Sequence, residues 1–317
     1  MKTAVNSFFN GHLLFLKHRL FHLGYLAGFA ALLLVVTGCD WKVFSLATFE
    51  VKVVGRWTNS LGMVFVKFER PAIAFSIWET RVQDFAAFVN DTGYTASVGM
   101  MSLNERNVWS QVGRTWRNPG FEQSPTHPVV GVSWNDAQAF CVWLTKKEQA
   151  AGRLTRNQVY RLPTDEEWSV AVGLPPETET SPWAKSQDHT DRRMQQYPQS
   201  QGKVNNSRNP FDVYPWGTAW PPPTNAGNYA AAFQVDAFPF TAPVGSFPPN
   251  QLGLYDLGGN VWEWCEDRIA PQAEQRVWRG ASFTCAPAYS TTRAFAVNSD
   301  CRADLGFRLV LATSTTN

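Results

Sequence analysis

The chain has 317 residues, a hydrophobic content of 44% and a formal net charge of +2 at pH 7. This length suffices for one sizeable domain, and the nearly balanced charge gives no basis for nucleic-acid binding. Fourteen tryptophans and twenty prolines indicate a core of aromatic side chains held between irregular segments, which is typical of a loop-rich fold.

The amino terminus has the pattern of a secretory signal. Residues 1–38 contain three basic side chains and no acidic one, and residues 20–36 are almost continuously apolar. The stretch ends in VTGC at residues 36–39, which resembles the lipobox of bacterial lipoproteins. The resemblance implies a signal peptide over 1–38 and a diacylglycerol on Cys39, which makes the membrane one partner of the chain. The alternative is a signal anchor that stays in the bilayer.

Both interpretations place the domain outside the cytoplasm, because the positive charges of a signal sequence stay inside. The lipobox interpretation predicts a membrane-anchored lipoprotein on the periplasmic side of the inner membrane or at the outer membrane. Residues 39–58 have mixed polarity and are predicted to be a tether that leads into the domain.

Hydrophobic spacing predicts the first regular elements of the domain. Weak alternation of apolar residues predicts a strand over 60–68. A one-sided apolar face predicts a helix over 80–90, and Gly93 follows at the point where a helix would stop. A second helix is predicted over 135–149 from its apolar stripe.

The next elements are less regular. Thr164 opens a short helix, because Glu167 stands three residues later and completes a capping box. Residues 174–212 are rich in polar side chains and proline, and are predicted to form a polar surface insertion. Turns and short strands follow to the carboxyl end, where Phe307 and Leu309 are predicted to lie in a final strand.

Seven segments of the domain resemble one known family. They are SLGMVFVKF at Ser60, HPVVGVSWNDAQAFCVWL at His127, YRLPTDEEW at Tyr160, YPWG at Tyr214, VGSFPPNQLGLYDLGGNVWEWCED at Val244, RVWRGASFTC at Arg276 and DLGFRLV at Asp304.

These segments are similar to those of the formylglycine-generating enzyme (sulfatase-modifying factor) family, in unbroken order over residues 59–310. The resemblance implies a loop-rich α+β fold, related to C-type lectins, for a domain over residues 59–313. It also implies the activity of the family, a copper-dependent oxidation of a cysteine in sulfatases to formylglycine.

The resemblance also places the catalytic residues of the family. Its enzymes bind Cu(I) with two cysteines, and Cys285 matches the first of them, with Ser282 three residues earlier. Five residues after Cys285, where the second cysteine belongs, the chain has Ser290. Cu(I) prefers soft thiolate ligands and a hydroxyl is a poor substitute, so copper is not expected here. Asp304 replaces an asparagine of the active region and adds negative charge beside it.

The remaining cysteines leave alternatives open. Four cysteines follow Cys39, namely Cys141, Cys265, Cys285 and Cys301, and they permit up to two disulfides in an oxidising compartment. Cys301 is a candidate partner of Cys285, either in a disulfide or as a surrogate second thiol for copper. Free thiols are the third possibility.

The resemblance implies two calcium sites built from side-chain and main-chain oxygens. The alternative is that Asn228 and Asp236 cap turns and that Glu263 pairs with an arginine. The residues carried over are Asn228, Tyr229, Asp236 and Phe238 for the first site, and Asp256, Gly259, Val261 and Glu263 for the second.

Three functions remain after this comparison. The first is a binding or accessory protein that recognises a peptide, protein or glycan through a groove lined by Trp262, Phe283, Tyr289 and Asp304. The second is a formylglycine-generating oxidase that acts on exported sulfatases, supported by Cys285 and Ser282. The third is another oxidoreductase on the same fold. Whether the chain is an enzyme therefore depends on the thiols near Cys285.

Overall fold

The computed structural model describes residues 51–96, 99–103, 108–111, 113–196 and 211–314, all of which belong to one compact unit that begins at Thr48. The predicted signal peptide, Cys39 and the first part of the predicted tether lie outside these residues. Within the described part, no helix is both long and apolar enough to cross a bilayer.

The first sheet of the described part has five antiparallel strands in the order β1-β2-β3-β11-β6. β1 occupies residues assigned from the sequence to the tether, and all but one of its residue pairs with β2 are in regular register. The first sheet therefore begins at Val53, within the segment that the sequence assigns to the tether. The strands are β1 (Val53–Thr58), β2 (Val64–Phe68), β3 (Ile73–Ser76), β6 (Gln158–Arg161) and β11 (Val310–Thr313).

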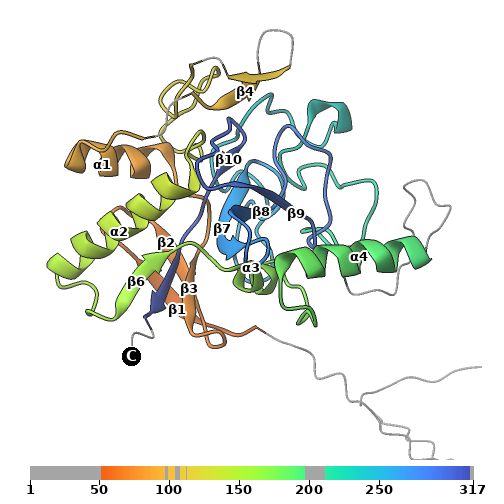
Figure 1. Cartoon of the computed structure of the whole chain (residues 1–317), viewed down its shortest axis with the longest axis horizontal. Coiled ribbons are helices and arrows are strands. Elements are labelled where there is room, and N and C mark those ends of the chain that lie inside the picture. The colour runs from red at the N-terminus through yellow and green to blue at the C-terminus, as the bar shows by residue number, and fades with distance from the viewer. Residues whose placement is uncertain (1–50, 97–98, 104–107, 112, 197–210, 315–317) are drawn as a thin grey trace, which may run out of the picture. The chain divides into compact units, whose positions relative to one another are not determined.

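Helices α1 (Val82–Thr92) and α2 (Trp134–Ala150) pack against each other, and α2 packs along β6 (Figure 1). α1 ends at Gly93, which adopts the left-handed conformation that glycine tolerates best. α2 starts with a capping box formed by Ser133 and Asp136. Both predicted helices are confirmed to within two residues at each end.

Aromatic rings join these helices to the closing segment of the chain. Phe85 of α1, Phe140 of α2 and Phe307 are fully buried, with ring centroids 5.6–6.5 Å apart. Burial of one such side chain stabilises the fold by roughly 1.5–3 kcal/mol. Phe307 and Leu309 lie between the last two strands and outside both of them, so neither is in the final strand, which begins at Val310.

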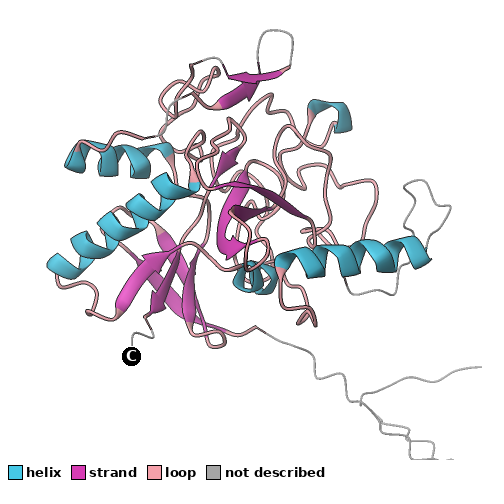
Figure 2. Cartoon of the chain, in the orientation of Figure 1, coloured by secondary structure: helices cyan, strands magenta, loops and turns pink. Residues whose placement is uncertain are grey.

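The second sheet lies at the centre of the unit and has the order β10-β7-β8-β9. The long connections around it are loops and turns, as Figure 2 shows, and this agrees with the predicted loop-rich fold. A separate two-stranded ribbon joins β4 to β5. The strands are β4 (Met101–Leu103), β5 (Trp109–Gln111), β7 (Trp262–Arg268), β8 (Gln275–Arg279), β9 (Arg293–Val297) and β10 (Leu305–Gly306).

Two further helices lie along the chain between β6 and β7. α3 (Asp165–Ala171) begins with the predicted capping box, because Thr164 accepts a bond from the Glu167 amide and Glu167 accepts one from the Thr164 amide. α4 (Pro182–Gln196) lies inside residues 174–212, so part of the predicted polar insertion is a regular helix. A single 3-10 turn, Ala231–Phe233, precedes the loops that lead to β7.

Candidate functional site

Cys285 lies in the loop between β8 and β9. The Cys285 amide donates to the Ser282 carbonyl at 3.0 Å, and the Cys285 carbonyl accepts from the Ala230 amide at 3.0 Å. These bonds hold the half-buried thiol 3.4 Å from the Ser282 hydroxyl and 3.6 Å from the Thr284 hydroxyl. The polar atoms that contact this sulfur are therefore two hard hydroxyl oxygens.

Asp304 organises the two hydroxyls. Its carboxylate is fully buried and accepts from Ser282 at 3.1 Å and from Thr284 at 2.7 Å. The Arg302 guanidinium donates to the same carboxylate at 2.9 Å, so the negative charge expected from the sequence is paired. Arg302 also stacks on Trp109 with 4.0 Å from its guanidinium carbon to the ring centroid. The sequence analysis did not identify Thr284 and Arg302 as site residues. Thr284 directly precedes Cys285, and Arg302 lies two residues before Asp304.

Ser290 is held by its backbone. Its amide donates to the Val213 carbonyl at 2.8 Å, and its carbonyl accepts from Arg279 at 2.7 Å. The side chain is buried, yet its hydroxyl has no hydrogen-bond partner among the described residues. Next to it, Tyr289 stacks on Tyr214 with ring centroids 4.6 Å apart.

The two serines of this loop should respond differently to replacement by alanine. Ser290→Ala removes a buried hydroxyl that makes no bond, so we expect stability to change by less than about 0.5 kcal/mol or to rise. Ser282→Ala removes a bonded hydroxyl and leaves Asp304 one donor short, at a cost of about 1–2 kcal/mol. Urea unfolding of both variants measures the difference. Equal losses would contradict this account of the loop.

The four cysteines in the described residues are all free, so a disulfide between Cys285 and Cys301 is not formed. Cys301 packs with Met100 and Ala303 in a small cluster apart from the main core, and burial raises the pKa of its thiol to about 11. Cys141 and Cys265 are fully buried, and burial also raises the pKa of each. Burial therefore favours the neutral thiol form of all three groups.

The aromatic residues predicted to line a groove lie at different depths. Trp262 and Phe283 are core side chains with exposed fractions of 8% and 6%, and the Trp262 ring lies 5.5 Å from that of Trp278. Tyr289 alone of these three rings is half-buried. Trp262 and Phe283 therefore support the loop from below, and Tyr289 is the one placed to contact a ligand.

The residues of the first predicted calcium site come together. The Asp236 carboxylate accepts from the amides of Tyr229 at 3.0 Å and Phe238 at 2.8 Å. Asn228 donates to the Phe240 carbonyl at 2.7 Å, while its side-chain oxygen is buried without a partner in the described part. Asp236 thus caps a turn, as the alternative interpretation predicted, and the Asn228 oxygen remains available to a cation.

The second predicted calcium site contains a buried ion pair. Both oxygens of Glu263 accept from Arg308 at 2.6 Å, and both side chains are fully buried, which confirms the predicted pairing with an arginine. Burial raises the pKa of Glu263, that of Asp256 to about 6, and that of neighbouring Glu79. One oxygen each of Asp256 and Glu79 has no partner among the described residues.

The unpartnered side-chain oxygens of Asn228, Glu79 and Asp256 are hard donors of the kind that calcium prefers, but they are few. Among the described residues, no three His, Cys, Asp or Glu side chains are grouped so as to share a metal ion. Calcium at either site would therefore depend on the unpartnered Asn228 and Asp256 oxygens together with main-chain carbonyls, which calcium accepts as ligands.

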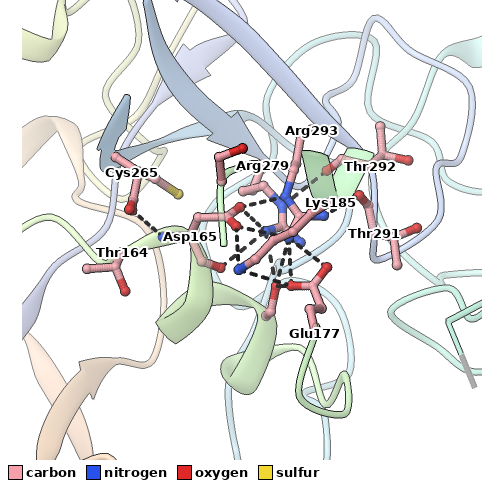
Figure 3. A network of polar contacts seen from close by, with 12 residues as sticks. Thr164, Asp165, Glu177, Lys185, Cys265, Arg279, Thr291, Thr292 and Arg293 are labelled. Atoms are coloured by element: carbon pink, nitrogen blue, oxygen red, sulfur yellow. Dashed lines mark hydrogen bonds and ion pairs between the residues drawn. The ribbon is translucent and has the colours of Figure 1, made fainter. Parts of the chain in front are cut away.

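A buried network of charged groups lies beside Thr291 and Thr292, which belong to the same loop as Ser290 (Figure 3). Asp165, the first residue of α3, pairs with Arg279 of β8 and Arg293 of β9. Burial alone would raise the pKa of Asp165, but these two guanidinium groups hold it below its usual value. Arg293 also pairs with Glu177 at 2.7 Å.

The network extends into α4. Lys185 lies 3.3 Å from Asp165 and 3.6 Å from Glu177, and the His189 ring nitrogen lies 2.7 Å from Glu177. Lys185 and His189 are buried, although α4 was predicted only as a polar surface segment. The helix is therefore attached to the domain by paired charges.

The same arginines hold the site loop. Three successive carbonyls accept from them: Ser290 and Thr292 from Arg279, at 2.7 and 3.1 Å, and Thr291 from Arg293 at 3.0 Å. Since both arginines are anchored by Asp165, the position of Ser290 depends on a charge network that reaches α4.

The fold and this loop define a class: a loop-rich α+β domain with a thiol in the connection between two strands of its central sheet. A family profile described as "Sulfatase-modifying factor enzyme 1-like domain" matches residues 66–313, more than half of the chain. The chain belongs to this sulfatase-modifying factor family.

Relatives of two kinds are found. The formylglycine-generating enzyme of Bos taurus is 29% identical over 282 residues, which cover 75% of this chain and 65% of the bovine protein. The inactive C-alpha-formylglycine-generating enzyme 2 of Bos taurus is 35% identical over 189 residues, or 55% of this chain and 46% of that protein. The chain thus spans less than two thirds of the length of each.

A solved structure, that of PvdO from Pseudomonas aeruginosa, is similar with a TM-score of 0.51 and 21% sequence identity. The match covers 82% of this chain and 91% of PvdO. At this identity the likeness concerns the fold alone, and it agrees with the α+β architecture predicted from the sequence.

Proposed function

We propose that the chain is an extracytoplasmic, lipid-anchored binding or accessory protein that recognises a peptide, protein or glycan without oxidising it. The observation that carries the proposal is the set of donors around Cys285. They are the hydroxyls of Ser282 and Thr284, backed by the Asp304 carboxylate. Hard oxygens do not fit Cu(I), which prefers sulfur, so the site lacks the ligands for the copper chemistry of the family.

In this proposal Ser290 occupies the position of the second catalytic cysteine. The loop can present Tyr289 to a ligand, because its backbone is fixed by Arg279 and its ring is stacked on Tyr214. Pre-organised aromatic side chains contribute strongly to binding, since little conformational freedom is lost.

The second candidate is a formylglycine-generating oxidase with altered ligands. It is supported by the retained Cys285–Ser282 pair, with its 3.4 Å contact, and by the 29% identity to the bovine enzyme. Incubation of the purified protein with Cu(I), oxygen and a cysteine peptide of a sulfatase, followed by mass spectrometry, separates the two. We expect the peptide to keep its thiol. Formylglycine that is lost in Cys285→Ala would establish the oxidase instead.

The anchor is proposed on the sequence around Cys39. Radioactive palmitate fed to expressing cells should label the full chain and should not label Cys39→Ala. Equal labelling of the two proteins would remove the lipoprotein assignment.

Calcium is proposed as a structural ligand, on the unpartnered oxygens of Asn228 and Asp256. Since a ligand bound only by the folded state stabilises it, a calcium chelator should lower the melting temperature, and added calcium should restore it. Asn228→Ala should reduce the size of this shift. An unchanged melting temperature in the chelator would show that neither site binds calcium.

A further inference from the structure

The described residues enclose a cavity of about 860 Å³ at some distance from the thiol of Cys285 along the chain. It lies between the turn Tyr214–Gly217, the segment 223–226 and the loop 247–252, with residues 256–258 as its floor. This volume is in the range of sites that bind small molecules or short peptides. None of the predicted groove residues borders the cavity, although Tyr214 connects it to Tyr289 by ring stacking.

One wall of the cavity is formed by aromatic rings that are held in place by contacts with one another. Tyr214 and Trp216 both border the cavity, and their rings are parallel within 4° with centroids 4.7 Å apart. Trp220 stacks on Tyr214 at 5.5 Å, and the Trp216 ring nitrogen donates to the Ala219 carbonyl at 3.0 Å. Because Tyr214 also stacks on Tyr289, other rings cover its faces, and the Trp216 ring is the part of this wall that can contact a ligand.

Backbone stiffness keeps the cavity in shape. Four of the lining residues are prolines, and proline has little conformational freedom to lose. On the floor, Gly258 has no room for a side chain, because an added Cβ would collide with Pro215 and with the Tyr229 hydroxyl. The prolines are Pro215, Pro223, Pro248 and Pro249.

The polar groups of the cavity are neutral hydrogen-bonding side chains. Thr224, Asn225 and Gln251 are exposed at its edge, and their side chains form no hydrogen bond to another described residue. No lysine, arginine or histidine is among the lining residues, and Asp256 is the one acid. A phosphate or carboxylate ligand would therefore find no basic side chain among the lining residues.

We propose that this cavity binds an extended, proline-containing peptide segment in the polyproline II conformation. Such a segment forms no internal hydrogen bonds, so its carbonyls can accept from side-chain amides and hydroxyls at the edge of the cavity. Its proline rings pack on flat aromatic faces, and its pre-set conformation lowers the entropy lost on binding. An aromatic wall, neutral donors and a stiff frame are the features that this ligand requires.

The test is calorimetric titration of the purified protein with hexaproline, with a glycine-serine hexapeptide as the comparison peptide. We expect saturable binding of hexaproline alone. Trp216→Ala should weaken it about tenfold or more, as loss of a central aromatic contact does. Trp183→Ala is the matched control, because Trp183 is 49% exposed on α4 and packs on Phe295 away from the cavity lining.

Because Trp216 also packs against the core, a milder variant accompanies it. Gln251→Ala changes an exposed polar side chain at the edge of the cavity, and it should weaken hexaproline binding about threefold. The proposal is overturned if hexaproline gives no saturable heat, if neither variant alters its binding, or if a chitin trisaccharide binds in its place. None of these results bears on the chemistry at Cys285, which is tested separately.

Discussion

Replacing Arg308 by methionine should lower the free energy of unfolding by about 3–5 kcal/mol, since the change leaves a buried charge without its partner. Arg308 is fully buried, binds both oxygens of Glu263, and donates to the Tyr255 carbonyl at 2.9 Å. Without it, the buried Glu263 loses the guanidinium that pairs with it, while the carboxyl groups of Asp256 and Glu79 remain close by. Urea unfolding at neutral pH measures the loss.

The matched control for this variant is Arg268→Met at the exposed end of β7, which we expect to change stability by less than about 0.5 kcal/mol. The double variant Glu263→Gln with Arg308→Met should recover part of the loss, because the unpaired charge is gone. A loss in Arg308→Met no larger than in the control would contradict the importance of this pair.

The second large effect is expected for Arg279→Met, with a loss of about 3–5 kcal/mol and a loosened site loop. This guanidinium is fully buried, pairs with Asp165, and holds the carbonyls of Ser290 and Thr292. Amide hydrogen exchange should therefore become faster in residues 289–292, where local opening becomes easier.

Lys185→Met is the matched variant for the loop effect. It removes a cation from the same buried acids, at 3.3 and 3.6 Å, but leaves the loop carbonyls with their donors. We expect it to destabilise the protein without changing exchange in 289–292. If Arg279→Met and Lys185→Met altered exchange there to the same extent, the loop would not depend on Arg279.

The sequence predicted the elements whose signals are local. The first two helices, the capping box at Thr164 and the helix stop at Gly93 each depend on residues a few positions apart, and the structure confirms them. The family and its fold were predicted for a similar reason, because continuous segments such as GGNVWEW are similar to the sequence motifs of the family.

The charge network could not be predicted in this way. Asp165 is 114 residues from Arg279 and 128 residues from Arg293, and no local pattern joins them. Residues 174–212 also have few apolar side chains, so their composition favoured a surface loop. Lys185 and His189 are buried there because Lys185 pairs with Asp165 of α3 and the His189 ring contacts Glu177, an arrangement that composition does not reveal.

Burial of the aromatic residues was the other gap. Glycine, aromatic and acidic residues alternate without a helix or strand period in this region, so no pattern separates inward from outward rings. The sequence therefore did not reveal that Trp262 and Phe283 are core residues and that Tyr289 is half-buried. β1 was also not predicted. Its residues, Val53–Thr58, have mixed polarity, and their strand conformation becomes recognisable only through their pairing with β2.

The most direct test of the account is the Cu(I) affinity of the purified domain, measured by competition with a chromogenic chelator. Unaltered protein should take up no equivalent of Cu(I), because one thiol among hydroxyls is a poor site for a soft ion. Ser290→Cys serves as the positive control, since it supplies the second thiol at the spacing of the family. One equivalent of tightly bound Cu(I) in the unaltered protein, lost in Cys285→Ala, would contradict the account.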